Sequence, residues 1–125
     1  IFQQQRPTGF IQFYFQVSDL SQLQKRLIQL NDLKTQQTKY LRVQGVKVFI
    51  DGTLGSGTAD TKCLCHYQGS PWTDAHLDEL FLQTWQSGFE IACHCIGENA
   101  VDKVVETARR TLAKGVTGHL HIEHA

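Results

Sequence analysis

Three short segments are rich in cysteine or histidine, the side chains that most often bind transition metals in proteins. The sequence reads ACHCIGEN at 92–99, HLHIEH at 119–124 and CLCH at 63–66. Together they could form a thiolate zinc site, a catalytic site built on histidine, or no site. The choice depends on which of these side chains share a face of the folded chain, so the elements that carry them have to be placed first.

The composition limits the class of protein. The 125 residues are enough for one domain with a core of its own. The 12 Lys and Arg residues balance the 12 Asp and Glu residues without a basic stripe, so nucleic acid is not an expected partner. No apolar run has the length of a membrane span and no signal peptide is visible, so we expect no membrane contact. The Cys-x-Cys spacings favour free thiols, which indicates a cytoplasmic location.

Two features suggest a piece of a longer protein. The sequence contains no Met, even at position 1, and it stops at IEHA directly after an apolar alternation. We therefore expect the whole protein to have further segments.

Hydrophobic periodicity predicts four strands and three helices. Strands are expected at 10–17, 41–52, 89–94 and 119–124. Helices are expected from Ser18 or Asp19 to about Leu30, from Thr73 to Gly88, and from Asn99 to Gly115, with a glycine-rich loop at 52–72. The buried face of the third helix is predicted to be Val101, Val104, Val105, Ala108 and Leu112. This order predicts an α/β fold with a parallel sheet, and either a doubly wound sheet or part of a (β/α)8 barrel fits the pattern.

Alternation along the strands predicts which polar groups meet. In the second strand, Lys47 alternates with apolar residues that are predicted to pack under the helices, namely Val46, Val48 and Ile50. Lys47, His94 and His124 are thereby predicted on one face, with both histidines at the carboxyl ends of strands, where parallel α/β folds bind ligands. Cys93 and Cys95 fall on the face opposite His94. Histidine, not cysteine, is therefore the predicted ligand.

Each of these residues also has an ordinary structural explanation. A histidine at a strand end is often only a partly buried polar residue, and Lys47 could extend its amine into solvent. Cys93 and Cys95 could be small core residues. The functional interpretation depends on the agreement of three positions.

Three segments resemble successive motifs of the amidohydrolase superfamily: VKVFIDGTLGSGTA (46–59), HCIGENAVD (94–102) and HIEHA (121–125). The resemblance is closest to amidohydrolase family three, which includes N-substituted formamide deformylases, and it covers the chain from Leu41 onward. Members are (β/α)8 barrels with one or two divalent metal ions at the carboxyl ends of the strands. The resemblance implies that residues 1–125 form a single partial (β/α)8 barrel domain, roughly strands three to six.

The same resemblance assigns roles to residues. His94 and His124 correspond to metal ligands, and Lys47 corresponds to a lysine that carries a carbamate bridging two metal ions, most often zinc. Positions that line the substrate cavity correspond to Asp51, Gly52 and His121. The implied reaction is hydrolysis of an amide-like or formamide-like carbon–nitrogen bond in a small molecule, by a water that the metal activates.

The chain departs from the family pattern in several places. It has no counterpart of the family's first-strand His-x-His pair or of its last-strand Asp. Gly57 and His121 stand where Arg is common, and Glu98 replaces the usual Asp. We therefore expect the 125-residue chain by itself to be inactive as a hydrolase.

Two alternatives remain open. The first is a non-enzymatic zinc-binding module that uses Cys63, Cys65 and His66 together with Cys93 or Cys95. The second is a flavodoxin-like α/β domain that binds an unrelated ligand at a glycine-containing turn.

A partial barrel would also expose two strand edges and the apolar side chains of its interior. Phe49, Leu120 and Ile122 are predicted to belong to that interior face. We therefore expect the chain to form homo-oligomers through its strand edges.

Overall fold

Strands and helices alternate along the residues that the computed structural model describes, 9–52, 58–61 and 70–125. The elements are β1 (Ile11–Gln16), the 3-10 helix η1 (Leu20–Gln22), α1 (Leu23–Lys34), β2 (Leu41–Phe49), α2 (Asp74–Gln86), β3 (Glu90–His94), α3 (Glu98–Ala113) and β4 (Leu120–Glu123). Every predicted helix and strand is present, although α1 continues to Lys34 instead of ending near Leu30. The predicted cysteine and histidine cluster at 63–66 lies outside the described residues.

The helix ends follow capping signals in the sequence. The side chain of Asp19 accepts a hydrogen bond from the backbone N–H of Ser21 at the start of η1, and Thr73 does the same for His76 at the start of α2. Gly88 and Gly115 follow α2 and α3 with φ angles of 82° and 83°. Glycine adopts this left-handed conformation without strain, so both helices stop where the sequence predicts.

The start and the buried face of α3 differ from the prediction. Asn99 lies inside the helix, and its side chain donates to Asp60 Oδ1 at 3.1 Å instead of capping α3. Val105 and Leu112 are exposed, and the buried positions are Ala100, Val104, Thr107 and Thr111. The two threonines can be buried because each hydroxyl donates to the carbonyl four residues earlier, at 2.8 and 2.9 Å, which leaves the methyl group to pack.

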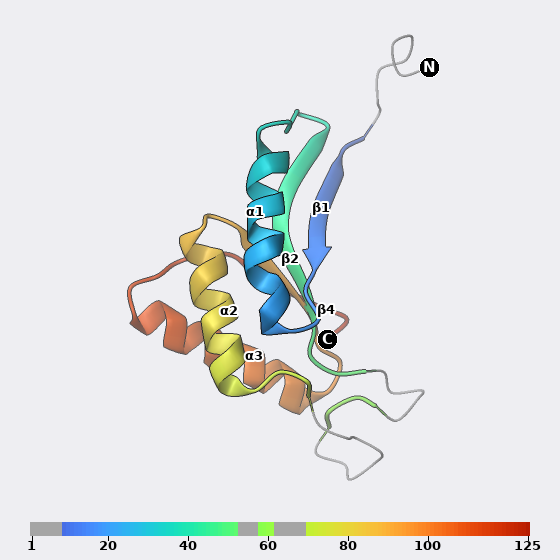
Figure 1. The fold of residues 1–125 in the computed structure, drawn as a ribbon. Coiled ribbons are helices and arrows are strands. Elements are labelled where there is room, and N and C mark those ends of the chain that lie inside the picture. The colour runs from blue at the N-terminus through green and yellow to red at the C-terminus, as the bar shows by residue number, and fades with distance from the viewer. Residues whose placement is uncertain (1–8, 53–57, 62–69) are drawn as a thin grey trace.

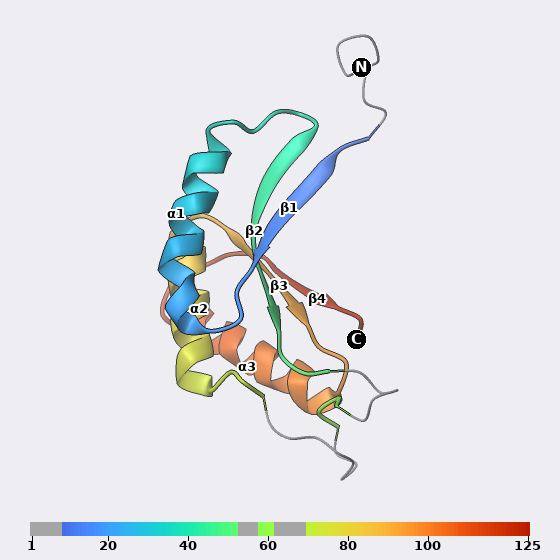
Figure 2. The same ribbon diagram turned by 45° about the vertical axis from the view of Figure 1, so that its right-hand side comes forward.

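The four strands form one parallel sheet in the order β1-β2-β3-β4. Figure 2 shows the α-helices of the described residues, α1, α2 and α3, on one side of this sheet and none of them on the other. A doubly wound sheet has helices on both faces and reverses its strand order at a switch point. The flavodoxin-like alternative is therefore wrong for this chain, because each strand is added beside the previous one.

The core residues come from the sheet and from the helices that cover it, whose arrangement Figure 1 shows. As predicted, Val46, Val48 and Ile50 are fully buried on the helix side, together with Ile91 and Cys93 of β3. They meet the apolar stripes of α1 and α2, which consist of Leu23, Leu27, Leu30, Leu77, Leu80, Phe81 and Trp85. Burying one large apolar side chain contributes roughly 1.5–3 kcal/mol, so this layer is the main source of stability.

The backbones of β2 and β3 approach closely at Gly45. A Cβ atom added to Gly45 would lie 1.8 Å from the carbonyl oxygen of Glu90, its register partner in β3. Only glycine fits there, and the pairing it permits sets the register of every residue farther along both strands. Lys47 and His94 owe their relative position to this contact.

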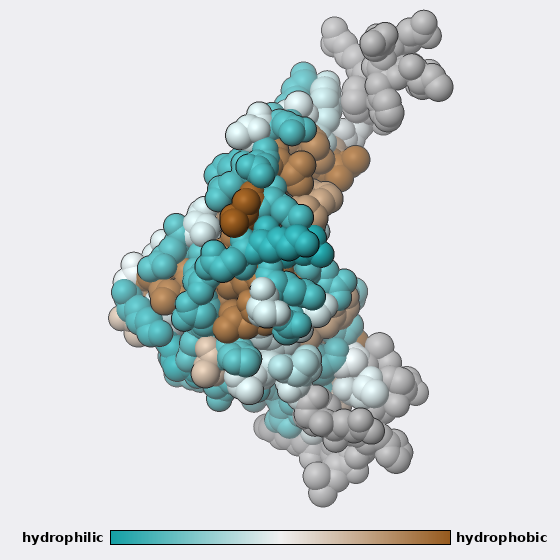
Figure 3. All heavy atoms as spheres, in the orientation of Figure 1, coloured by the Kyte–Doolittle hydropathy of each residue, from teal (hydrophilic) through white to brown (hydrophobic). Residues whose placement is uncertain are grey.

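Apolar side chains also gather at the exposed edge of the sheet. Ile11, in the edge strand β1, is 65% exposed, and Phe10 beside it is 63% exposed. Figure 3 shows this apolar group at the start of β1, against a surface that is otherwise mostly hydrophilic in this view. None of the helices in the described residues is long and apolar enough to cross a membrane.

Candidate metal centre on the bare face of the sheet

The side of the sheet without helices carries most of the predicted site residues. The β2–β3–β4 register aligns Phe49, His94 and Glu123 in one row, and Lys47 and His121 in the row before it. Paired residues of a parallel sheet point to the same side. The carboxyl ends of three neighbouring strands therefore present these five side chains together on the bare face.

The rings of His94 and His124 meet at this end of the sheet. Their centroids lie 5.0 Å apart, with His94 buried and His124 exposed to solvent. His94 closes β3, while His124 follows β4 with a φ of 68°, in the left-handed region that a residue with a Cβ seldom adopts. The prediction that these two histidines share a face agrees with this placement.

The route by which His124 reaches that face differs from the prediction. Alternation assigned His124 to the same face as Leu120 and Ile122, but those two residues pair with Ile91 and Cys93 and pack against the helix-covered core. Their assignment to the bare interior face is wrong. His124 arrives on the bare face because the chain turns after Glu123, and strand alternation cannot predict such a turn.

Lys47 is paired with Glu123, a residue that the sequence interpretation missed. The ammonium group of Lys47 forms an ion pair with the carboxylate of Glu123, and only 16% of the Lys47 side chain is exposed. A lysine inside an apolar strand requires a partner when it is buried. That requirement was the available signal. However, the assignment of Leu120 and Ile122 to the bare face implied that Glu123, which alternates with them, points to the opposite face.

One nitrogen of the His94 ring is already engaged. Nε2 of His94 lies 2.8 Å from the carbonyl oxygen of Gly52, and 4.0 Å from Oδ1 of Asp51. A carbonyl can only accept, so Nε2 carries the proton and donates it. In the neutral ring the lone pair is then on Nδ1, which is the atom left to bind a metal ion.

The carboxylate of Asp51 accepts hydrogen bonds from three backbone N–H groups. Its Oδ1 accepts from the N–H of Ile96 at 3.0 Å, and its Oδ2 accepts from the N–H groups of Gly97 and Asp60 at 2.8 and 2.9 Å. The side chain is fully buried. Both oxygens are thus engaged within the protein, and the prediction that Asp51 contacts substrate stays untested. The same holds for Gly52, whose carbonyl faces His94.

His121 lies on the bare face, one row nearer the start of the strands than Glu123. Its Nε2 is 2.8 Å from Oε1 of Glu90, and its ring centroid is 6.4 Å from that of Tyr14 in β1. Burial raises the pKa of Tyr14, and the carboxylates of Glu90 and Glu123 raise it further. This part of the bare face is therefore polar, and Tyr14 keeps its proton over a wide pH range.

Neither of the two described cysteines, Cys93 and Cys95, takes part in this arrangement. Cys93 and Cys95 are fully buried free thiols of the core cluster on the helix side. A hydrogen bond with Cys95, together with burial, raises the pKa of the Cys93 thiol well above its usual range. The thiolate form that binds zinc is disfavoured there. These two residues behave as the packing residues that the strand pattern predicts.

The donors on the bare face fit a divalent cation in type but are few in number. Among residues 9–52, 58–61 and 70–125, no group of three or more His, Cys, Asp or Glu side chains is arranged to hold a metal ion. His94 and His124 supply two imidazoles, which are common ligands of zinc. A complete centre needs at least one further ligand, for which Lys47 and Glu123 lie nearest in the register.

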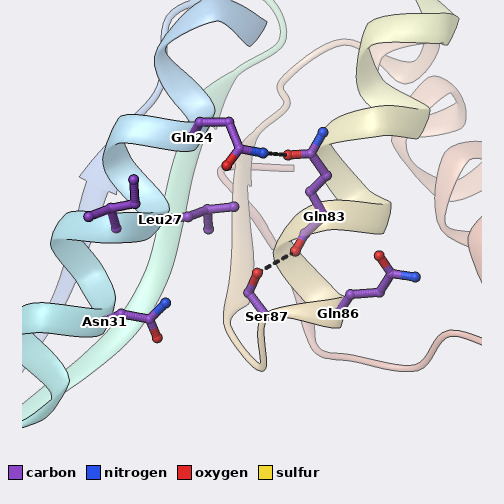
Figure 4. A pocket seen from close by; sticks show the side chains of 7 residues that line it. Gln24, Leu27, Asn31, Gln83, Gln86 and Ser87 are labelled. Atoms are coloured by element: carbon purple, nitrogen blue, oxygen red, sulfur yellow. Dashed lines mark hydrogen bonds between the residues drawn. The ribbon is translucent and has the colours of Figure 1, made fainter.

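A hollow on the opposite side of the sheet carries no such chemistry. It has a volume of about 250 Å³ and lies between α1 and α2, lined by Gln24, Leu27, Ile28, Asn31, Gln83, Gln86 and Ser87. Figure 4 shows the amide groups of Gln24 and Gln83 in contact across it. No residue of this lining titrates near neutral pH, so the bare face remains the better candidate site.

Two solved structures with the same arrangement of elements are described as uncharacterized metal-dependent hydrolases. One, from Pyrococcus horikoshii OT3, is 22% identical with a TM-score of 0.59, covering 88% of this chain and 23% of its own. The other, from Pyrococcus furiosus, is 19% identical with a TM-score of 0.60, covering 87% of this chain and 28% of its own. This chain therefore spans about a quarter of the length of either hydrolase. No curated protein matches it.

The sequential parallel sheet, covered by helices on one face, is part of a (β/α)8 barrel of the kind found in metal-dependent hydrolases. The sequence model of the amidohydrolase family matches residues 3–125. The chain belongs to this family, in the branch called family three.

Proposed function

We propose that the whole protein is a metal-dependent hydrolase that cleaves an amide-like or formamide-like carbon–nitrogen bond in a small molecule. The observation that carries the proposal is the meeting of the His94 and His124 rings, 5.0 Å apart, at the carboxyl ends of adjacent strands. Ligands of (β/α)8 barrels bind at that end. Membership of the amidohydrolase family supports the reaction class, and the four strands would be barrel strands three to six.

In this proposal the site holds one or two divalent cations, and His94 and His124 bind one of them. Zinc is the first candidate, because both ligands are imidazoles. When bound, such a cation supplies Lewis acidity that activates water and polarises a carbonyl group. Nδ1 of His94 is the ligating atom, since its Nε2 donates to the Gly52 carbonyl. The remaining ligands come from other parts of the whole protein.

Lys47 contributes as a carbamate. The ammonium group first gives up one proton to solvent, and the neutral amine then attacks the carbon of carbon dioxide and gives up a second, so that the resulting carbamate anion would serve as a ligand for divalent cations. The low exposure of its side chain supports this role. Glu123, which now pairs with the ammonium group, would then lose that partner and turn toward another cation or toward substrate.

His121 is the proposed substrate contact deeper in the barrel, where its partner Glu90 fixes the ring. Asp51 and Gly52 form the adjoining wall. We place the protein in the cytoplasm, because both described cysteines are free thiols in the core. The 125-residue chain alone should lack activity, since two imidazoles do not complete a cage.

The test uses the whole protein, loaded with zinc and assayed against N-formyl and N-acyl amines. We expect bound zinc and hydrolysis that chelation abolishes and added zinc restores. A protein that binds zinc but releases no amine from any such substrate would contradict the proposed reaction. A protein in which His94→Ala and His124→Ala leave the zinc content unchanged would contradict the proposed site.

A further inference from the structure

We propose that Asp51 is a positioning residue for His94: by fixing the loop after β2, it holds the Gly52 carbonyl against Nε2 of His94 and so leaves Nδ1 free for a metal ion. The link between Asp51 and His94 is a property of the described chain. Its consequence for metal binding rests on the proposed function.

The first step is the anchoring of Asp51. Its carboxylate accepts three backbone N–H groups, from Asp60, Ile96 and Gly97, at 2.8 to 3.0 Å. These donors belong to the loop at 58–61 and to the turn between β3 and α3. Charge-assisted hydrogen bonds of this kind are about twice as strong as neutral ones, so Asp51 locks the carboxyl ends of β2 and β3 together.

The second step leads from Asp51 to its neighbour. Gly52 donates its N–H to the carbonyl of Thr58 at 2.9 Å, and a Cβ added to Gly52 would lie 1.8 Å from Oγ1 of Thr58. The backbone of Gly52 is therefore held at its N–H and leaves no room for a side chain. Its oxygen points at Nε2 of His94, with 2.8 Å between the two atoms.

The third step is electrostatic. Oδ1 of Asp51 lies 4.0 Å from Nε2 of His94, which is too far for a hydrogen bond. At this distance the negative charge of the carboxylate still favours a proton on Nε2. The buried carboxylate and the Gly52 carbonyl thus act in the same direction. Both place the ring proton on Nε2 and leave the lone pair on Nδ1.

A purely structural role makes a different prediction. Asp51 also accepts from the N-cap residue of α3, Gly97, which has no capping side chain of its own. If Asp51 only stabilised the start of α3, its loss would lower stability and leave the tautomer of His94 unchanged. Asp60 provides the matched control, because its side chain holds the same helix start through Asn99.

The experiment records two-bond ¹H–¹⁵N spectra of the metal-free 125-residue chain at about pH 8, where a histidine of ordinary pKa is neutral. The His94 signals are assigned from the spectrum of His94→Gln. We expect wild type and Asp60→Asn to show the Nε2–H tautomer of His94. We expect Asp51→Asn, which removes the charge at constant size, to show a mixture of both tautomers.

A zinc titration on the same samples measures the consequence for binding, because the His94 signals report on this site and not on the cysteines. We expect half-saturation of His94 to need about tenfold more zinc in Asp51→Asn than in wild type, as is common when a residue that orients a ligand is lost. A whole protein whose His94→Gln variant binds zinc as tightly as the wild type would contradict the proposed function and not the link between Asp51 and His94.

Two results would overturn the proposal: an Nδ1–H tautomer of His94 in the wild type, or an unchanged Nε2–H tautomer in folded Asp51→Asn. If Asp51→Asn does not fold, Asp51→Glu replaces it, since it keeps the charge but moves it. If neither variant folds, the wild-type tautomer decides the question.

Discussion

The ring of His124 lies against the ring of His94, with 5.0 Å between centroids, although His94 ends β3, His124 follows β4, and only His94 is buried. A left-handed backbone at His124 makes this contact possible. Two separate structural features position the pair: His94 lies at the end of β3, and His124 lies in the turn after β4. Each can be tested without disturbing the other.

Removing either ring should abolish metal-dependent activity. In the whole protein, we expect His94→Ala and His124→Ala each to lower kcat/KM by at least about 100-fold, because each removes a ligand of the cation that activates water. The matched control is His119→Gln, since His119 is exposed and the described contacts of this residue use only its backbone carbonyl. An unchanged kcat/KM in both alanine variants would rule out the pair as ligands.

Gly45 should tolerate no side chain. We expect Gly45→Ala to lower the free energy of unfolding by at least about 3 kcal/mol, because its Cβ would collide with the backbone of Glu90 and force β2 and β3 apart. Urea unfolding measures the difference. Gly9→Ala is the control, since a Cβ at Gly9 meets nothing within 4 Å. Equal stability of the two variants would show that the strands can separate without cost.

The raised pKa of Cys93 should weaken the fold at alkaline pH. An unfolded thiol ionises near about pH 8.5, whereas the folded thiol keeps its proton to a higher pH. Above that pH the unfolded state is stabilised by ionisation, so this contribution to stability is complete below about pH 8.5 and is lost as pH rises toward the folded pKa.

Urea unfolding at pH 8 and pH 9.5 checks this prediction for Cys93. We expect the wild type to lose about 1 kcal/mol more than Cys93→Val between these two values. Valine keeps most of the buried volume and has no proton to lose. Identical losses in both proteins would mean that Cys93 ionises equally in the folded and unfolded states.

The exposed edge of the sheet should make the chain associate with itself. We expect oligomers of the 125-residue chain at roughly tens of micromolar in sedimentation velocity, because no strand of the described residues pairs with the outer edges of β1 and β4. Ile11→Lys should weaken association, since it places a charge on the edge strand β1. Ile28→Lys is the matched control: Ile28 is 60% exposed but lies on α1. A monomer under these conditions would contradict the prediction.

The parts of this structure that follow from hydrophobic periodicity and from the alternation of side chains along a strand were predictable. The alternation in β2 correctly separates Lys47 from Val46 and Val48, since a strand buried on one face must turn every second residue inward. The glycines after α2 and α3 mark the ends of these helices, because glycine adopts the left-handed conformation that stops a helix. Family resemblance added the partial barrel, which alternation alone could not distinguish from a doubly wound sheet.

The parts that depend on a single backbone angle or on pairing between strands were not predictable. The side of β4 that faces the helices is set by its register with β3, so Leu120 and Ile122 were assigned to the wrong face. The same error explains why Glu123 was not predicted as the partner of Lys47. The buried threonines of α3 were missed because a hydroxyl bonded to its own helix packs like an apolar group.

Because every strand of the described residues pairs with the strand that comes next in the sequence, none of these three pairings has to wait for a distant part of the chain. During synthesis, β1 can pair with β2 as soon as α1 has crossed over, and each later unit finds a finished edge to join. Short-range pairing of this kind keeps the entropy cost of each addition small. The order of translation and the order of assembly can therefore coincide.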